Sequence, residues 1–168
     1  MTSTEAILTD AFERVRGVVH RVLDGLDEAA LTARPTPTAN SIGWLVWHLT
    51  RIQDDHVADL AGVDQRWTAG GWAARFGLPF DDDETGYAQS SDDVAAVRGV
   101  PAEVFAGYLD AVHAATVAYL RGIDEAELSR VVDTAWDPPV TAAVRLVSVV
   151  SDDLQHAGQA AYVKGLLD

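Results

Sequence analysis

The sequence predicts an all-α protein, a four-helix bundle with a long aromatic-rich segment between its second and third helices. Apolar residues recur at three- and four-residue spacing over four long stretches, which is the period of an amphipathic helix. No stretch of useful length shows the apolar–polar alternation of a strand. Most connections between the four stretches are short or of medium length, which favours a bundle.

Length and composition are those of one domain that spans residues 1–168. The chain has 168 residues, of which 48% are hydrophobic, so it can bury a full core. No apolar run is long enough to cross a bilayer, and the first ten residues lack the pattern of a signal peptide. We therefore expect a cytoplasmic protein without a membrane partner. The eleven arginines to one lysine favour a bacterial source with GC-rich coding.

The charge and the absence of cysteine exclude several functions. The formal net charge is −14, and no basic stripe interrupts it. Such a surface repels phosphate backbones, so we expect no nucleic-acid partner. Because the chain has no cysteine, it has no disulfide, thiolate ligand or thiol nucleophile of its own. The apolar stripes also allow a homodimer.

Capping and turn residues mark the ends of the first and third long helices. Thr2 followed by Glu5 is a capping box, and Gly25 suits the end of the first helix. Pro101 suits the first turn of the third long helix, which Gly122 ends. Apolar stripes between these positions predict that both helices pack on a common core.

The second helix, Ser41 to Leu60, carries a histidine among apolar neighbours. Ser41 or Asn40 can cap it. His48 lies in its middle, one turn after Trp44 and one turn before Ile52. A lone histidine in such surroundings is more often a core residue than a ligand, so its role depends on what lies opposite.

The segment from Gly62 to Ser90 is too rich in aromatic residues to be a solvated linker. Structureless loops of this length in a compact domain are usually functional or partly helical. We expect this segment to fold over the bundle, either as simple cover or as a lid or pocket wall. Its aromatic residues are Trp67, Trp72, Phe76, Phe80 and Tyr87.

The last helix, Val140 to Leu167, is apolar on more than one side and is predicted to be a core helix. Thr141 can act as its N-cap, and Asp153 is expected to be a surface carboxylate. One predicted core stripe comprises Ala143, Val147, Val150, Leu154, Ala157 and Ala161. A second comprises Val149, Ala160, Val163 and Leu167.

A narrow polar stripe crosses this apolar helix. Asp152 and His156 are four residues apart, so their side chains meet on one face, and Gln159 lies near them. A carboxylate on a mostly buried helix needs compensation, which solvent, an ion pair with the histidine or a metal ion could supply. The serine, threonine and glutamine of the stripe are unlike the lysine and glutamate usual on wet faces.

Together, His48 from the second helix and the Asp152–His156 pair from the last form a candidate metal site. Bundles build such sites from inward side chains on facing helices. Two imidazoles and one carboxylate leave coordination positions open for water or substrate. Around them, Trp44 and Gln159 are the expected pocket lining. Outer positions go to Asp55 and His56, either of which is a possible base.

These residues resemble the DinB-like (DinB/YfiT) superfamily of four-helix metalloproteins, in helix order over nearly the whole chain. Many members carry three histidine ligands, the last two as a pair four residues apart. Here Asp152 stands first in that pair, as in the branch similar to the N-terminal domain of mycothiol-dependent maleylpyruvate isomerase. The resemblance lies in Ser41-Ile42-Gly43-Trp44-Leu45-Val46-Trp47-His48-Leu49 and in Asp152-Asp153-Leu154-Gln155-His156-Ala157-Gly158-Gln159.

The resemblance implies a divalent metal on His48, Asp152 and His156, Zn²⁺ first, with Ni²⁺ or Fe²⁺ as alternatives. It also implies thiol chemistry, in which the metal activates a low-molecular-weight thiol of the mycothiol type toward a small electrophile. The expected enzyme is an S-transferase or isomerase. Two alternatives stay open: a metal-dependent hydrolase that activates water, and a non-catalytic ligand-binding or stress bundle.

Overall fold

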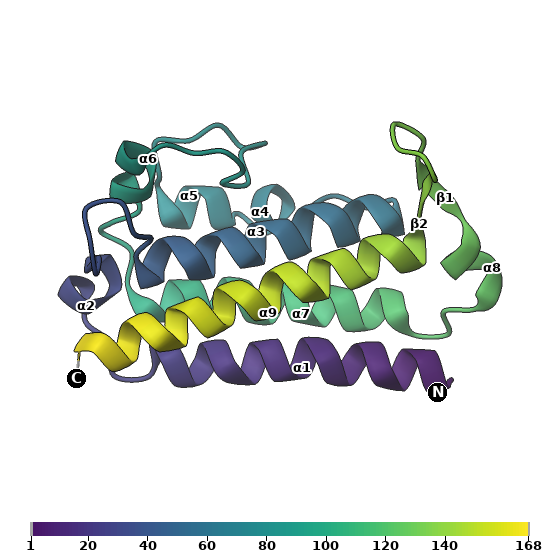
Figure 1. Cartoon of the computed structure of the whole chain (residues 1–168), viewed down its shortest axis with the longest axis horizontal. Coiled ribbons are helices and arrows are strands. Elements are labelled where there is room, and N and C mark those ends of the chain that lie inside the picture. Colours follow the sequence, from purple (N-terminus) through teal and green to yellow (C-terminus); the bar gives the residue numbers. More distant parts are fainter. Residues whose placement is uncertain (1, 168) are drawn as a thin grey trace.

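Four long helices form the body of the protein in a computed structural model that describes residues 2–167. They are α1 (Ser3–Leu23), α3 (Ile42–Ala61), α7 (Ala102–Leu120) and α9 (Ala142–Leu167). Both α1 and α3 pack against α7 and α9. Figure 1 shows that α3 and α7 run in the same direction, because the chain between them returns along the outside of the bundle. The predicted four-helix bundle is confirmed.

The predicted N-terminal caps of α1 and α3 are present, whereas α1 ends at Leu23, before the predicted Gly25, and Pro101 is the N-cap of α7 rather than a first-turn residue. Glu5 N donates to Thr2 Oγ1 (3.1 Å) and Thr2 N donates to Glu5 Oε2 (3.3 Å), so the capping box is formed. Ser41 Oγ accepts from Trp44 N at 3.2 Å and caps α3. At its other end α3 stops at Gly62, whose φ of 65° suits glycine.

The segment between α3 and α7 covers one side of the bundle. It contains three short helices, α4 (Arg66–Ala69), α5 (Trp72–Phe76) and α6 (Ser91–Ala96), and a further short helix, α2 (Glu28–Thr32), precedes α3. Trp67 and Phe76 are buried in the main hydrophobic core, and Trp72 and Phe80 pack against it. Tyr87 differs from the other aromatic residues of the segment, because 87% of its surface is exposed.

A small antiparallel β-hairpin, which the sequence did not predict, is added to the helical bundle. After α8 (Glu125–Ser129), β1 (Val131–Asp133) pairs with β2 (Val140–Thr141), which leads directly into α9. Strands this short hold too few residues to show an alternating pattern. The last helix therefore begins at Ala142 rather than at Val140. Thr141 Oγ1 accepts from Val144 N at 3.4 Å, as an N-cap does.

The inner face of α9 differs from the predicted one. Val147 and Leu154, placed in the core by the first apolar stripe, are 63% and 45% exposed. Asp153, predicted on the surface, has no exposed surface. Because α9 packs one side against α1 and α3, the core takes Val149, Ala160 and Val163 of the second stripe but only Ala157 of the first, and Leu167 of the second stripe is exposed. Its buried residues are Ala142, Leu146, Val149, Asp153, Ala157, Ala160 and Val163.

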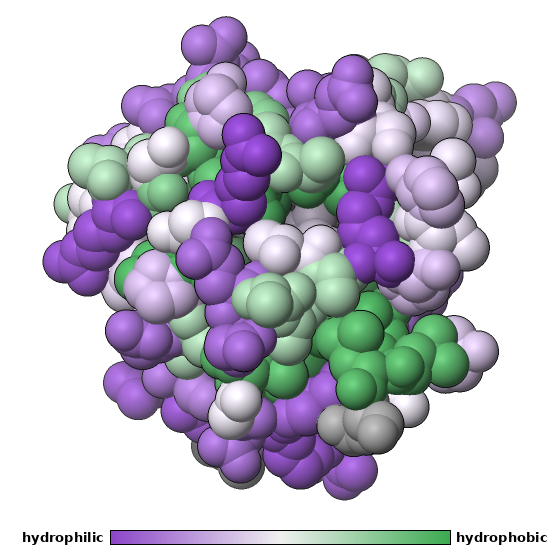
Figure 2. Space-filling view, turned by 90° about the vertical axis from the view of Figure 1, so that its left-hand side faces the viewer, coloured by the Kyte–Doolittle hydropathy of each residue, from purple (hydrophilic) through white to green (hydrophobic). Residues whose placement is uncertain are grey.

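The last turn of α9 carries apolar side chains on the surface. Leu166 and Leu167 are 53% and 44% exposed. Figure 2 views the end of the molecule where α9 stops and shows an apolar patch there. Among the described residues, no helix combines the length and the apolar character needed to cross a membrane.

Candidate metal centre

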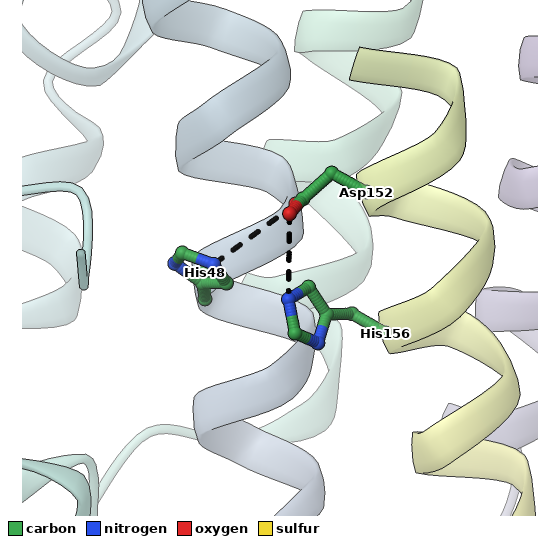
Figure 3. Close-up of side chains that lie close together, drawn as sticks. All are labelled: His48, Asp152 and His156. Atoms are coloured by element: carbon green, nitrogen blue, oxygen red, sulfur yellow. Dashed lines mark ion pairs between the residues drawn. The ribbon is translucent and has the colours of Figure 1, made fainter. Parts of the chain in front are cut away.

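Contact between α3 and α9 brings three predicted ligand side chains together. His48, Asp152 and His156 each offer one ligand atom, and these atoms lie within 4.8 Å of one another. His48 Nε2 is 4.0 Å from Asp152 Oδ2, and His156 Nε2 is 3.5 Å from Asp152 Oδ1. Figure 3 shows the two imidazole rings turned toward the carboxylate. The two histidines come from separate helices, so the cluster exists only in the folded chain.

A backbone carbonyl fixes the orientation of His48. The ring is buried, and its Nδ1 lies 2.6 Å from the carbonyl oxygen of Thr85. A carbonyl oxygen only accepts, so Nδ1 carries the hydrogen, and the lone pair of Nε2 faces Asp152. Trp44 stacks on the same ring at 4.7 Å between centroids. Histidine ligands of metals are usually held in this way through their second nitrogen.

The side chain of Gln159 fixes the orientation of the His156 ring. Its side-chain oxygen lies 2.9 Å from His156 Nδ1, one helical turn along α9. When that oxygen accepts, Nδ1 carries the hydrogen, and the lone pair of Nε2 again faces Asp152. Both predicted lining residues, Trp44 and Gln159, therefore touch a histidine of the cluster.

Asp152 supplies the observation that tests whether a cation fits. Its Oδ2 atom is buried and has no hydrogen-bond partner. A buried carboxylate oxygen without a partner is costly unless a cation or a donor reaches it. The atoms facing it are ring nitrogens that present lone pairs rather than hydrogens. The three side chains therefore fit a divalent ion that accepts two nitrogen ligands and one oxygen ligand.

The surroundings of the three side chains shift their pKa values. Burial lowers the pKa of His48, so its ring is neutral near pH 7. Burial alone would raise the pKa of Asp152, but the neighbouring His156, with the charges of His48 and His56, lowers it overall. The neighbouring Asp152 raises the pKa of His156, so a metal ion competes with a proton for this ring. A neutral imidazole and an ionised carboxylate are the protonation states that bind metals.

Residues 81–89, here called the strap, reach His48 from the segment between α3 and α7. Arg51, which has no exposed surface, holds the strap from inside the bundle. Its Nε donates to the carbonyl of Glu84 (3.0 Å) and its Nη2 to that of Asp82 (3.1 Å). These two carbonyls precede Thr85, the residue that contacts His48. A cationic side chain in the core thus sets the position of the carbonyl that orients His48.

Gly86 allows the strap to approach this closely. Its φ is 94°, in the region that favours glycine. A Cβ at this position would lie 2.6 Å from His48 Nδ1 and 3.2 Å from the Trp44 ring. Gln89, further along the strap, accepts from Trp44 Nε1 at 2.8 Å. The sequence analysis did not predict the contacts of the strap with His48, because a backbone carbonyl is present in every residue type. Only Gly86, a glycine at a position of close approach, could have indicated them.

The two predicted outer residues lie further along α3. Asp55 accepts from the side chain of Gln65 at 2.8 Å, and His56 lies 3.1 Å from the guanidinium of Arg145. Both line a hollow of about 640 Å³ on the far side of Arg145. His56 also lines the groove that contains Asp152, so of the two it is nearer the site.

Asp153 lies next to the site and was misplaced by sequence reasoning. Both of its carboxylate oxygens are buried and lack hydrogen-bond partners. Burial raises its pKa well above the ordinary value, and the charge of Asp152 adds to this. Nothing in its residue type distinguishes it from Asp152, since only the rotation of α9 decides which of the two faces the core.

The fold and the cluster define the class of protein, a DinB-like four-helix bundle with a candidate metal centre between α3 and α9. The chain is similar to a conserved protein from Enterococcus faecalis of known crystal structure. The two are 32% identical, with a TM-score of 0.90 over 98% of this chain and 96% of that chain. No curated protein matches the sequence.

The sequence profile of the mycothiol-S-transferase family matches residues 7–168. The chain therefore belongs to the mycothiol-S-transferase family, and it is an enzyme of that type. Membership confirms the expected resemblance and the expected class of thiol-dependent transferase.

Proposed function

We propose that His48, Asp152 and His156 hold a divalent ion, and that the enzyme transfers a mycothiol-type thiol to a small electrophile at this ion. The buried, unpartnered Oδ2 of Asp152 between two imidazole nitrogens is the observation that carries the proposal. Membership of the family supplies the thiol and the reaction type. Nitrogen and carboxylate ligands in a three-residue set favour Zn²⁺, with Ni²⁺ and Fe²⁺ as alternatives.

When bound, a divalent ion at this place supplies Lewis-acid chemistry that lowers the pKa of a thiol and makes a thiolate available near neutral pH. The chain itself supplies orientation. Thr85 and Gln159 fix the tautomers of the two histidines, and Trp44 covers one face of His48. With no cysteine in the chain, the attacking sulfur has to come from the substrate.

In the transfer, the sulfur–hydrogen bond of the thiol breaks and its proton passes to solvent or a base. The sulfur bonds to carbon of the electrophile, and the group displaced from that carbon leaves with the electron pair of the broken bond. His56 lines the same groove as Asp152, and its charge acts on that carboxylate. Burial and the charge of Arg145 lower the pKa of His56, so the ring is neutral; its Nδ1 accepts from Arg145 at 3.1 Å, and it can take a proton there only when this contact opens.

The test is turnover by the metal-loaded protein with mycothiol and a panel of electrophiles. Wild type is expected to consume thiol and electrophile together, and the Asp152→Asn variant to lose at least about a hundredfold in kcat/KM. Product formation in the absence of any thiol would instead favour a hydrolase that activates water. Metal binding without reaction in either assay would favour the non-catalytic alternative.

We also propose that the protein forms a homodimer through the outer face of α9. None of the exposed residues of α9, within 142–167, is charged, although the chain carries a net charge of −14. Like charges repel two copies over most surfaces, and this face lacks that repulsion. Val147, Leu154 and Tyr162 project from it, while Gly158 leaves room for a second helix.

A further inference from the structure

We propose that the groove beside Asp152 binds the electrophile, and that it selects uncharged aromatic electrophiles through Tyr87 and Trp136. This inference rests on the proposed function, because it concerns the second substrate of the same site. The groove has a volume of about 330 Å³, and Asp152 is one of its lining residues. A ligand in it therefore lies beside the candidate metal centre.

The lining of the groove is mostly apolar near Asp152. Ile52 from α3 and Val144 and Val149 from α9 form its walls. Concave sites of this size with apolar walls and a few polar groups are typical of small-molecule binding. The part of the substrate that sits here is therefore apolar, whereas the polar end of the groove is formed by His56 and Arg145.

Two aromatic side chains from separate segments line the same groove. Tyr87 belongs to the strap and is 87% exposed, and Trp136 lies in the loop between β1 and β2 and is 68% exposed. Neither contributes to the core. Large aromatic side chains left in water beside a pocket are typical of ligand contacts, and their flat faces suit a planar aromatic partner.

The charges around the groove disfavour an anionic electrophile. Arg145, its one guanidinium, is already engaged by Asp133 Oδ2 at 3.4 Å and by His56. Beyond Arg145 the adjoining hollow is lined by carboxylates. These are Asp55, Asp59, Asp64, Asp82 and Asp83. A carboxylate on the electrophile would find Arg145 already engaged and would face this acidic lining.

Two chlorinated dinitroaromatic compounds, one uncharged and one with a carboxylate, test both parts of the proposal when each rate is compared with its own uncatalysed reaction with the thiol. With 1-chloro-2,4-dinitrobenzene, the thiol sulfur bonds to the ring carbon that bears chlorine, the carbon–chlorine bond breaks, chloride leaves, and the thiol proton passes to buffer. In 4-chloro-3,5-dinitrobenzoate the same step occurs on a ring that carries a carboxylate. Iodoacetamide, a small uncharged electrophile without a ring, serves as the reference for chemistry at the site itself.

The variants are Tyr87→Ala, Trp136→Ala and Trp136→Phe. Ile7→Ala on α1 is the matched control, since Ile7 is 69% exposed and is not part of the groove lining. KM for chlorodinitrobenzene is expected to rise about tenfold in the double alanine variant, with kcat and the iodoacetamide reaction unchanged. Trp136→Phe should restore most of the loss. For wild type, kcat/KM should be at least about tenfold lower with the benzoate than with the uncharged compound.

Equilibrium binding supplies a readout that needs no turnover. The unreactive compound 2,4-dinitroaniline should bind wild type and the Ile7→Ala control equally, and bind the double alanine variant about tenfold more weakly. Equal binding by all three proteins, or an equal rise in KM for iodoacetamide, would overturn the groove assignment. Loss of thiol turnover with every electrophile, while dinitroaniline still binds at the two aromatic residues, would instead overturn the proposed function alone.

Discussion

The two histidines of the candidate centre are held by the same device on different helices. His48 gives its Nδ1 hydrogen to a backbone carbonyl, and His156 gives its own to a side-chain amide oxygen. Both rings consequently present Nε2 to Asp152. Because the tautomers are set before any ion arrives, less ordering is needed on binding, which strengthens a metal site.

The outer partner of His156 can be removed without changing a ligand. Gln159→Leu leaves Nδ1 without its acceptor, so we expect the divalent-ion affinity to fall by about 10- to 100-fold while the fold is kept, since Gln159 is exposed. Competition with a coloured zinc chelator measures the affinity. Gln155→Leu is the control, because Gln155 is also exposed but bonds to Ser151. Equal affinities of the two variants would contradict the role given to Gln159.

The buried carboxylate of Asp153 is predicted to lower the free energy of unfolding. Its carboxylate is fully buried and both oxygens lack partners. Asp153→Asn removes the ionisable group at nearly constant volume, so the free energy of unfolding at pH 7 should rise by about 1–3 kcal/mol. Urea unfolding of the metal-free protein measures this. A destabilised variant would show that the carboxylate has a partner that this account lacks.

For single residues, the sequence indicated which side chains could bind a metal, but not which side of a helix is buried. The spacing of Asp152 and His156, and the apolar neighbours of His48, were enough to propose the three ligands. Asp153 was misjudged, because helical spacing alone does not say which apolar stripe of α9 meets the bundle. Thr85 was missed, because its contribution is a carbonyl oxygen and any residue type carries one.

Among the elements, the strap links the core of the bundle to the candidate centre. Arg51 holds two of its carbonyls, and the next one orients His48. The position of one imidazole therefore depends on a segment that contributes no ligand. Such an arrangement predicts that changes that displace the backbone of the strap act on metal affinity more than on the stability of the bundle.

Gly86→Ala tests the strap. The added methyl would meet His48 Nδ1 at 2.6 Å, so the strap has to withdraw from the ring. We expect about 10- to 100-fold weaker ion binding. Gly99→Ala is a matched control, because Gly99 also has a positive φ (73°) but its Cβ would meet nothing within 4 Å. Both variants pay the same backbone cost, which is about 1 kcal/mol. Similar ion affinities in the two would argue against the strap.

The long helices were predictable as elements, because each has a full amphipathic period and recognisable caps. The hairpin of β1 and β2 was not, since its strands hold three and two residues. The aromatic-rich segment was expected to fold over the bundle, and its buried tryptophan and phenylalanine do so. The sequence could not show that this segment orients His48, because the contact joins His48 to Thr85, which lies far from it in the chain.

At the scale of the whole molecule, a dimer would explain why the first apolar stripe of α9, predicted to be buried, is exposed at Val147 and Leu154. Val147 and Leu154 have the spacing of core residues, yet the bundle of one chain leaves them exposed. A second copy packed on α9 would bury them, and the absence of charge on this face removes the repulsion expected between two chains of net charge −14. The pattern in the sequence would then describe the core of a dimer.

Gly158→Leu tests the dimer without disturbing the monomer. The added side chain meets nothing within 4 Å of its Cβ in the chain, and leucine is the better helix former by roughly 0.8 kcal/mol. We expect a dimer for wild type and a monomer for Gly158→Leu in sedimentation experiments, with unchanged or higher stability. Ile7→Leu on α1 is the control and should remain dimeric. A monomeric wild type at micromolar concentration would refute the interface.

The central claim is that His48, Asp152 and His156 hold one divalent ion between α3 and α9. Its most direct test is the zinc content of the protein after loading with excess metal and dialysis. We predict about one equivalent per chain for wild type and less than about a tenth of that for His48→Ala, while the His113→Ala control, altered on α7, retains its zinc. Wild type without zinc, or His48→Ala with a full equivalent, would contradict the account.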